Sequence, residues 1–222
     1  MIELKNISKS FGTREVLKDI NLSVKEGELI SIMGKSGSGK TTLLNILSFF
    51  EYPTKGEYYF EGKLIKNENQ MSRIRNMNMG FVFQAYNLIP RLTVYENIML
   101  PIYYSLDRKH RKERIKCVNE LIEKYGLIDI KDSFVENISG GEKQRACMAR
   151  ALVCDAGLII SDEPTGNLDE NNKNNVLDMF KEMNKNGKTI IIVTHDKQVE
   201  NIATRKYFLE EGELKEREMV AD

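Results

Sequence analysis

The residues best suited to chemistry in this chain form one glycine-rich stretch, Gly34-Lys35-Ser36-Gly37-Ser38-Gly39-Lys40-Thr41-Thr42. It fits the pattern G-x-x-x-x-G-K-[ST], in which glycines let the backbone close around a polyphosphate because positive φ angles cost glycine little. The loop N–H groups and the N-terminus of a following helix would point at the phosphates. Lys40 would add a positive charge at the β- and γ-phosphates, and Thr41 would offer its hydroxyl to Mg²⁺. The stretch therefore predicts a binding loop for a nucleoside triphosphate.

The flanking residues support this prediction. An apolar run from Leu29 to Met33 precedes the loop, and Leu43 to Leu47 follows it. This is the order of strand, loop and helix that the motif needs for its meaning. The competing interpretation, an ordinary Gly/Ser turn before a helix, does not require both flanks.

A pair of carboxylates ends a second apolar run, Leu158-Ile159-Ile160-Ser161-Asp162-Glu163. At the carboxyl end of a parallel strand beside a phosphate loop, both side chains would face the ligand crevice. Asp162 would hold Mg²⁺, directly or through water. Glu163 would act as general base on the attacking water, a role worth roughly 10²–10⁴-fold in rate. Two solvated carboxylates at a strand end are the alternative.

A second anion-binding helix end is predicted at Ile138-Ser139-Gly140-Gly141-Glu142-Lys143-Gln144-Arg145. Ser139 can cap the helix, and the glycines leave N–H groups exposed. Alone, this stretch would be an ordinary helix cap. Together with the phosphate loop, it gives the chain two phosphate-binding helix ends.

The elements that must position these residues follow from periodicity. Apolar alternation or continuous apolar runs predict strands at Ile2–Ile7, Val16–Val24, 29–33, Glu57–Phe60, Met79–Gln84, 158–161 and Thr189–Val193, with an edge hairpin near Lys206–Leu209. Met71–Arg75 is expected to form a short helix, and the pattern from Thr93 to about Lys124 is helical. Thr93 and Glu96 have the spacing of a capping box, and Pro101 should kink or end that helix. The order predicts a helical subdomain inserted between two halves of a sheet domain.

Composition narrows the function classes. The chain has 222 residues, with Lys+Arg and Asp+Glu both 33, so no basic excess indicates nucleic acid. Neither a signal peptide nor an apolar run of ~18 residues is found, so we expect a cytoplasmic protein, or one held at a membrane by a partner. Three cysteines, Cys117, Cys147 and Cys154, lack metal-binding or disulfide spacing and are expected to be buried thiols.

Over essentially its whole length, the sequence resembles the ATP-binding subunits of ABC transporters. Gly34 to Thr42 looks like the Walker A motif, Leu158 to Glu163 like Walker B, and Ile138 to Gln144 like the signature motif that distinguishes this family. Asn167-Leu168-Asp169 matches the D-loop, and Gln84 the Q-loop glutamine. These motifs occur in the family's order and spacing.

The resemblance implies an α/β P-loop NTPase (RecA-like) core with an antiparallel β subdomain. The core would comprise residues 1–84 and 158–222, and the helical subdomain residues 85–157. It implies ATP and Mg²⁺, with Thr41, Gln84 and Asp162 at the metal. It also implies that His195 contacts the γ-phosphate, that Phe11 stacks on adenine, and that Asp169 communicates across a dimer.

The eight residues from Asp162 to Asp169, with Glu96 to Pro101, narrow the resemblance to one subfamily. It includes lipoprotein-release, macrolide-export, antimicrobial-peptide-resistance and cell-division ATPases. Phe11 replaces the commoner tyrosine, and ring stacking survives that change. Glu142 stands where many members have glutamine, and its carboxylate would repel a γ-phosphate unless it points away. Residues 154–157 lack a proline that many members carry.

The family implies a head-to-tail homodimer in the ATP-bound state, in which Ser139, Gly140 and Gly141 of one subunit complete the site of the other. Residues 85–92, apolar for a loop, would receive a transmembrane permease; a loop buried in the core is the alternative. A peptide, lipid-linked or drug-like substrate is expected, exported or extracted by that permease. An ATP-driven regulatory clamp without transport would use the same motifs. A GTPase would usually carry Asn-Lys-x-Asp, and this chain does not contain it.

Overall fold

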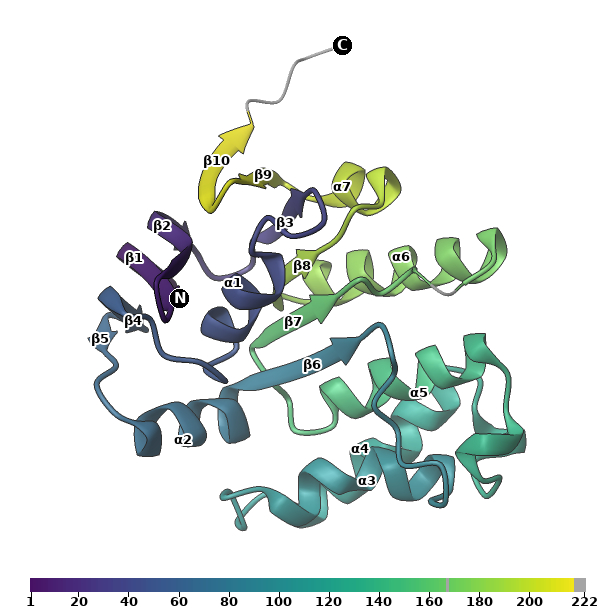
Figure 1. Cartoon of the computed structure of the whole chain (residues 1–222). Helices are drawn as coiled ribbons and strands as arrows, with labels where there is room; N and C mark the ends of the chain where they lie inside the picture. The colour runs from purple at the N-terminus through teal and green to yellow at the C-terminus, as the bar shows by residue number, and fades with distance from the viewer. Residues whose placement is uncertain (167, 218–222) are drawn as a thin grey trace.

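The computed structural model describes residues 1–166 and 168–217, which form two β-sheets and a set of surrounding helices (Figure 1). The smaller, antiparallel sheet has the order β2-β1-β4-β5, from β1 (Ile2–Phe11), β2 (Arg14–Val24), β4 (Lys55–Phe60) and β5 (Lys63–Leu64). The larger sheet has the order β10-β9-β3-β8-β7-β6, from β3 (Leu29–Gly34), β6 (Met79–Phe83), β7 (Leu158–Asp162), β8 (Thr189–Val193), β9 (Arg205–Glu210) and β10 (Glu213–Arg217). The helices are α1 (Lys40–Leu47), α2 (Glu68–Asn78), α3 (Val94–Tyr104), α4 (Arg111–Lys124), α5 (Gly140–Leu152), α6 (Glu170–Lys185) and α7 (Lys197–Ile202), with 3₁₀ turns at Ile128–Ile130 and Val135–Asn137.

The centre of the larger sheet is parallel and covered on both faces. Every residue of β3 and β8 is buried, which explains why both segments are continuous apolar runs in the sequence. β3 pairs in parallel with β8 and β9, and β7 pairs in parallel with β6 and β8. Parallel pairing brings the carboxyl ends of these strands to one edge of the sheet.

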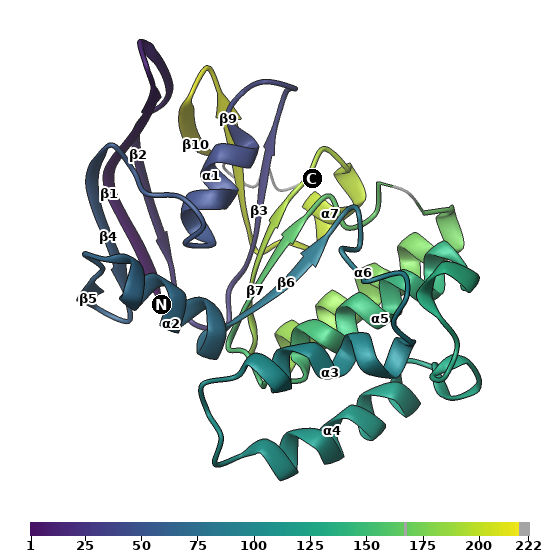
Figure 2. The same cartoon turned by 60° about the horizontal axis from the view of Figure 1, so that its bottom comes forward.

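Helix α1 lies between the two sheets (Figure 2). Its apolar residues Leu43, Leu44, Ile46 and Leu47 are buried in a cluster with side chains from both sheets. This close packing fixes the position and direction of α1, and α1 in turn holds the phosphate loop that precedes it at the edge of the sheet.

Helices α3, α4 and α5 lie between β6 and β7 in the chain and pack together as a separate helical layer (Figures 1 and 2). Helix α4 buries its apolar face here, since Val118, Leu121 and Ile122, with Tyr125 at its C-terminal end, all lie in this cluster. The capping box predicted at Thr93 and Glu96 is present. Gly80 lets β6 approach α5 closely, because a Cβ there would overlap the Ala151 carbonyl.

The predicted fold class is confirmed, with local differences. Pro101 lies inside α3, which continues to Tyr104, so the loss of one N–H donor near the helix end does not stop it. Helix α2 is longer than the Met71–Arg75 segment, because Asn67 caps it and Arg75 pairs with Glu68 along it. The expected edge hairpin is formed by β9 and β10, which pair antiparallel, and residues 218–222 lie outside the described residues. The division at residues 84/85 and 157/158 stays a prediction.

Candidate nucleotide site

The motif residues meet at the carboxyl edge of the larger sheet (Figure 1). In the order β3-β8-β7-β6, the strands end at Gly34, Val193, Asp162 and Phe83. The residues that follow are the phosphate loop, His195, Glu163 and Gln84, which belong to segments far apart in the sequence. The sheet therefore gathers at one edge most of the groups that the motifs singled out.

The loop backbone has the conformation that its glycines allow. Gly37 and Gly39 have φ angles of 77° and 103°, and Gly39 immediately precedes α1. A Cβ at Gly34 would overlap the Leu209 carbonyl and lie 2.7 Å from the Ser38 Oγ. The hydroxyl of Ser38 is buried without a hydrogen-bond partner. A close backbone and an unpaired buried hydroxyl fit a loop that surrounds phosphate oxygens.

Lys40 folds back over the loop. Its Nζ donates to the carbonyl oxygens of Gly34 at 2.7 Å and Lys35 at 2.9 Å. An ammonium has three N–H donors, so it can hold the loop and still donate to a phosphate oxygen. The Lys35 side chain instead forms an ion pair of 2.9 Å with Glu210. The charge of Lys35 is therefore paired with Glu210, and its backbone N–H is the group that a bound phosphate would meet.

A pocket of about 400 Å³ lies beside the loop, lined by Phe11, Arg14, Val16, Ser36, Gly37, Gly39, Lys40, Thr41 and Thr42. The Phe11 side chain is 52% exposed, so its ring is not part of the core. The Lys9 Nζ lies 4.9 Å from the ring centroid. One face of an exposed aromatic ring at the pocket rim suits stacking with a nucleobase. Arg14 was not a sequence candidate, although its place directly after the Phe11 turn could have suggested it.

Glu163 and His195 form a hydrogen-bonded pair. Glu163 Oε1 lies 2.8 Å from His195 Nδ1, and its Oε2 accepts hydrogen bonds from the His195 N–H and the Thr194 Oγ. A carboxylate can only accept hydrogen bonds, so Nδ1 carries the hydrogen of this contact, and the Nε2 side of the ring faces away from Glu163. Glu163 itself has a φ angle of 46°. Thr194, which donates to Glu163, was not a candidate from the sequence.

Asp162 sits between charged neighbours. Burial is the main cause that raises the pKa of its carboxyl group, Glu163 raises it further, and Lys40 lowers it. A cation placed beside Asp162 and Glu163 would oppose both raising effects. Desolvated oxygen ligands of this kind suit a divalent metal ion.

Oxygen donors for Mg²⁺ are present at Thr41, Asp162 and Gln84, and hard oxygen ligands are the type that this ion prefers. Over the described ranges, His, Cys, Asp and Glu side chains nowhere gather in a group of three or more that could hold a metal alone. The donor set thus fits an ion that shares its coordination with a bound triphosphate. A Cβ added at Gly166 would lie 2.8 Å from the Gln84 amide nitrogen, so a bare glycine gives the Gln84 side chain room.

The second predicted helix N-terminus is present, with Ser139 as its cap, but it does not join the phosphate-loop pocket. Ser139 is the N-cap of α5, and Ser139 and Gly140 are exposed. All residues that line the phosphate-loop pocket come from β1, β2, the loop and α1. Gly141 is buried, and a Cβ there would lie 2.8 Å from the Asn172 Cγ. Within one chain, the two helix ends therefore belong to separate surfaces.

Asp169 caps α6 beside this surface. Its carboxylate accepts hydrogen bonds from the backbone N–H of Asn172 at 2.9 Å and from the Asn172 amide at 2.8 Å, which lower the pKa of Asp169. Asn172 thus contacts both Asp169 and the Gly141 region. Asn167, the first residue of the predicted D-loop, lies outside the described residues.

A family comparison agrees with this geometry. Residues 17–166 match the model of the ABC transporter family, a span that includes the phosphate loop, the α5 N-terminus and Glu163. The chain belongs to the ABC transporter family. It is an ABC ATPase cassette, as the motifs predicted.

Curated relatives point to the same subfamily. The ABC cassette is 45% identical to the uncharacterized ABC transporter ATP-binding protein YvrO of Bacillus subtilis, over 96% of this chain and 95% of that protein. It is 38% identical to the lipoprotein-releasing system ATP-binding protein LolD of Francisella tularensis, with the same coverage. It is 41% identical to the macrolide export ATP-binding/permease protein MacB of Aggregatibacter actinomycetemcomitans, of which it covers 34%. The predicted subfamily is confirmed.

Solved cassettes have the same fold. The dimeric structure of the bacterial ABC transporter cassette MJ0796 matches this ABC cassette with a TM-score of 0.86, 36% identity and full coverage of both chains. The dimeric post-hydrolysis state of MJ0796 bound to ADP and Pi matches with a TM-score of 0.86 and 35% identity, again over both whole chains. A near relative has thus been captured with the products of ATP hydrolysis.

Proposed function

We propose that this cassette is the ATP-hydrolysing subunit of a transporter and works as a head-to-tail homodimer. Each ATP would lie between the phosphate loop of one subunit and Ser139, Gly140 and Gly141 of the other. The observation that carries the proposal is the separation of two anion-binding helix ends on different surfaces of one chain. Two copies supply the missing half to each other, and the dimeric MJ0796 structures support this arrangement.

The residues of the sheet edge have separate roles in this proposal. The backbone N–H groups of residues 34–42 bind the phosphates, and Lys40 stabilises the charge that develops on the transferred phosphoryl group. Glu163 takes the proton of the attacking water, while the His195 Nε2 faces the γ-phosphate. Thr41, Gln84 and Asp162 would hold Mg²⁺, which supplies charge neutralisation between phosphates. Phe11 stacks on the adenine, and Gln84 also orients the water.

Hydrolysis that needs two subunits should depend steeply on protein concentration. Each active site needs half its charge stabilisation from the partner, so only the dimer is active. At protein concentrations below the dissociation constant of the dimer, the specific ATPase activity should therefore rise in proportion to protein concentration. The measurement is phosphate release at saturating ATP over about a hundredfold range of protein concentration. A specific activity that stays constant while size-exclusion chromatography shows only monomers would contradict the dimer.

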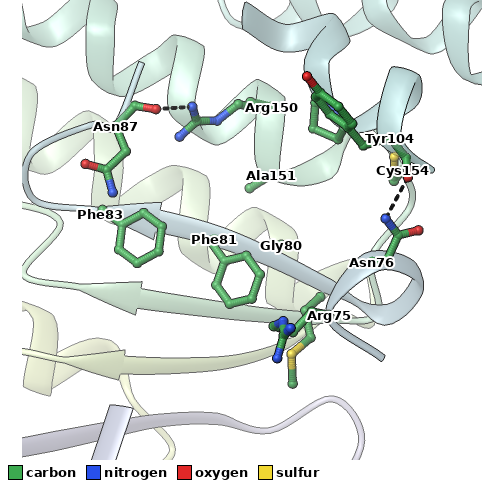
Figure 3. A pocket seen from close by; sticks show the side chains of 12 residues that line it. Arg75, Asn76, Gly80, Phe81, Phe83, Asn87, Tyr104, Arg150, Ala151 and Cys154 are labelled. Atoms are coloured by element: carbon green, nitrogen blue, oxygen red, sulfur yellow. Dashed lines mark hydrogen bonds between the residues drawn. The ribbon is translucent and has the colours of Figure 1, made fainter. Parts of the chain in front are cut away.

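A groove beside the Q-loop offers a place for the permease (Figure 3). It has a volume of about 310 Å³ and lies where β6, α2, α3 and α5 meet. The rings of Phe81 and Phe83, from the edge strand β6, lie parallel in it with centroids 5.9 Å apart. Asn87 follows the Q-loop and lines the groove, so an occupant would touch the segment that carries Gln84.

The adjoining loop is held rigidly enough to transmit a contact. Asn97 is fully buried and bonds to both the N–H and the carbonyl of Ile89. Arg150 donates to the carbonyls of Tyr86 and Asn87, at 2.7 and 2.5 Å. Leu88 packs into the helical core, whereas Ile89 is 45% exposed. Of these two apolar residues, Ile89 is therefore the one whose side chain is exposed to a partner.

Ile89→Asp should uncouple the cassette from its permease. The charge would lie on an apolar contact surface, so we expect stimulation of ATP hydrolysis by the reconstituted permease to fall roughly tenfold, while basal hydrolysis stays unchanged. The assay is ATP hydrolysis in proteoliposomes with and without the permease. Ile128→Asp, at another exposed apolar position, serves as control. Equal stimulation of both variants and the native chain would rule out Ile89 as a permease contact.

The proposed setting is the inner face of the cell membrane, where the permease would hold the cassette as a peripheral subunit. Within residues 1–166 and 168–217, no helix is both long and apolar enough to cross a bilayer. The names of LolD and MacB support a peptide, lipid-linked or drug-like substrate that is exported or extracted. Recognition of that substrate would lie in the permease.

A further inference from the structure

Glu142 closes a hydrogen-bonded ring around Ser139 at the N-terminus of α5. Its Oε2 accepts the Ser139 backbone N–H at 2.7 Å and the Ser139 hydroxyl at 2.6 Å. The Glu142 N–H donates in turn to the Ser139 Oγ at 3.4 Å. A serine hydroxyl has one hydrogen, and a carboxylate can only accept, so Ser139 gives its hydrogen to Glu142.

The carboxylate in this ring is charged. The hydroxyl bond from Ser139 is the main cause that lowers the pKa of Glu142, and the Ser139 backbone bond and Arg145 lower it further. A negative charge in the first turn of α5 is also favoured by the helix dipole. The negative charge of Glu142 is therefore directly hydrogen-bonded to the Ser139 hydroxyl, which is the side-chain donor of the signature motif.

An ATP molecule held by a second subunit would compete for the same hydrogen. Phosphate oxygens are acceptors, so the Ser139 Oγ must donate to contact the γ-phosphate. This contact requires the hydroxyl bond to Glu142 to break. It also brings a negatively charged phosphate close to a carboxylate, and like charges at such a distance repel each other.

We propose that Glu142 is a positioning residue that opposes closure of the ATP-bound dimer by holding the Ser139 hydroxyl, and so sets the ATP concentration at which the dimer forms. The inference rests on the proposed function, in which Ser139 faces the partner's ATP. Glutamine at this position would keep the ring, because its amide oxygen in the place of Oε2 can accept both the Ser139 backbone N–H and the Ser139 hydroxyl. A neutral amide oxygen holds the serine hydrogen less strongly than a carboxylate does, so the phosphate would take it more easily, and the repelling charge would be gone.

The test is the ATP dependence of dimerisation, measured by analytical ultracentrifugation in a Glu163→Gln parent that cannot turn over its ATP. We expect the added Glu142→Gln change to lower the ATP concentration at half-dimerisation roughly tenfold. ATP affinity of the dilute monomer should not change, because Glu142 does not line the phosphate-loop pocket. With native Glu163, Glu142→Gln should lower the KM for ATP and leave kcat nearly unchanged.

The chain contains a matched control. The capping box of α3 has the same geometry: Glu96 Oε2 accepts the Thr93 N–H at 2.8 Å and its hydroxyl at 3.0 Å. Glu96→Gln should reproduce any effect on helix capping, measured as a shift in unfolding temperature, and leave the ATP dependence of dimerisation unchanged. An effect on dimerisation shared by both variants would show that capping, not the Glu142 charge, is responsible.

Two outcomes separate this inference from the proposed function. If the Glu163→Gln parent dimerises with ATP and Glu142→Gln needs the same or more ATP, Glu142 does not oppose closure and the inference fails alone. If the parent stays monomeric at every ATP concentration, the dimer proposal fails and the inference falls with it.

Discussion

Glu163→Gln should abolish ATP turnover and trap an ATP-bound dimer. The amide has nearly the size of the carboxylate but cannot accept a proton from water, so we expect the hydrolysis rate to fall roughly 10²–10⁴-fold. Binding of ATP should persist, since the pocket beside the phosphate loop does not include Glu163. Phosphate release and size-exclusion chromatography with ATP and Mg²⁺ measure the two effects.

The hydrogen bonds around Glu163 can mostly be kept by glutamine, so the substitution should change the chemistry without changing the local structure. In the structure, Glu163 accepts hydrogen bonds from Thr194 and from both the backbone and Nδ1 of His195. An amide oxygen can accept the Nδ1–H bond and the amide nitrogen can donate to the Thr194 Oγ, so that only the 3.2 Å contact from the His195 backbone N–H loses its acceptor. Fold and local geometry should therefore survive, and the unfolding temperature should stay close to that of the native chain.

Glu182→Gln supplies a control for the loss of one carboxylate. Glu182 lies on α6, half exposed, in an ion pair of 2.9 Å with Lys124. Its substitution should leave turnover unchanged, because exposed ion pairs contribute little to stability. Turnover by Glu163→Gln within a factor of ten of the native rate would exclude Glu163 as the general base.

The meeting of the motifs could be predicted because it follows from a general property of parallel sheets. Leu29–Met33, Leu158–Ser161 and Thr189–Val193 are apolar runs without alternation, which indicates strands covered on both faces. Functional residues that follow such strands must share one edge. The pairing of Glu163 with His195 is a consequence, since β7 and β8 are neighbours.

The contacts around the signature helix were harder to predict. The Ser-x-x-Glu spacing of Ser139 and Glu142 is the same signal that identified the Thr93 capping box, yet Glu142 was considered from the sequence only as a charge near a phosphate. The local spacing therefore contained the information. The contact of Gly141 with Asn172 is different in kind, because it depends on how α5 and α6 pack and leaves no local pattern.

Some elements had weak sequence signals for physical reasons. Helix α2 buries only Met71 of its residues, so its apolar periodicity is faint and only its centre was predicted. Strand β10 is mostly exposed and charged, as an edge strand can be, so its sequence has no apolar pattern that would define its bounds. In both cases, backbone pairing or capping determines the structure more than hydrophobic pattern does.

Lys40→Ala should remove most ATP binding and hydrolysis together. The Lys40 ammonium bonds to the carbonyls of Gly34 and Lys35, and these bonds place it at the mouth of the phosphate loop. Its loss removes a positive charge from the ground state and the transition state, so ATP affinity should fall at least tenfold and kcat roughly 10²–10³-fold. Equilibrium binding of a fluorescent ATP analogue and phosphate release measure the two parts.

Two further variants test whether the loop needs an ammonium at this position or only a positive charge. Lys40→Arg keeps the charge, but a planar guanidinium cannot reproduce the compact contact of an ammonium with two neighbouring carbonyls, so we expect it to restore less than a tenth of the lost activity. Lys116→Ala removes an exposed lysine of α4 and should change nothing, which controls for net charge. Full activity of Lys40→Arg would mean that the loop needs only a cation. Native ATP affinity of Lys40→Ala would mean that backbone N–H groups alone hold the phosphates.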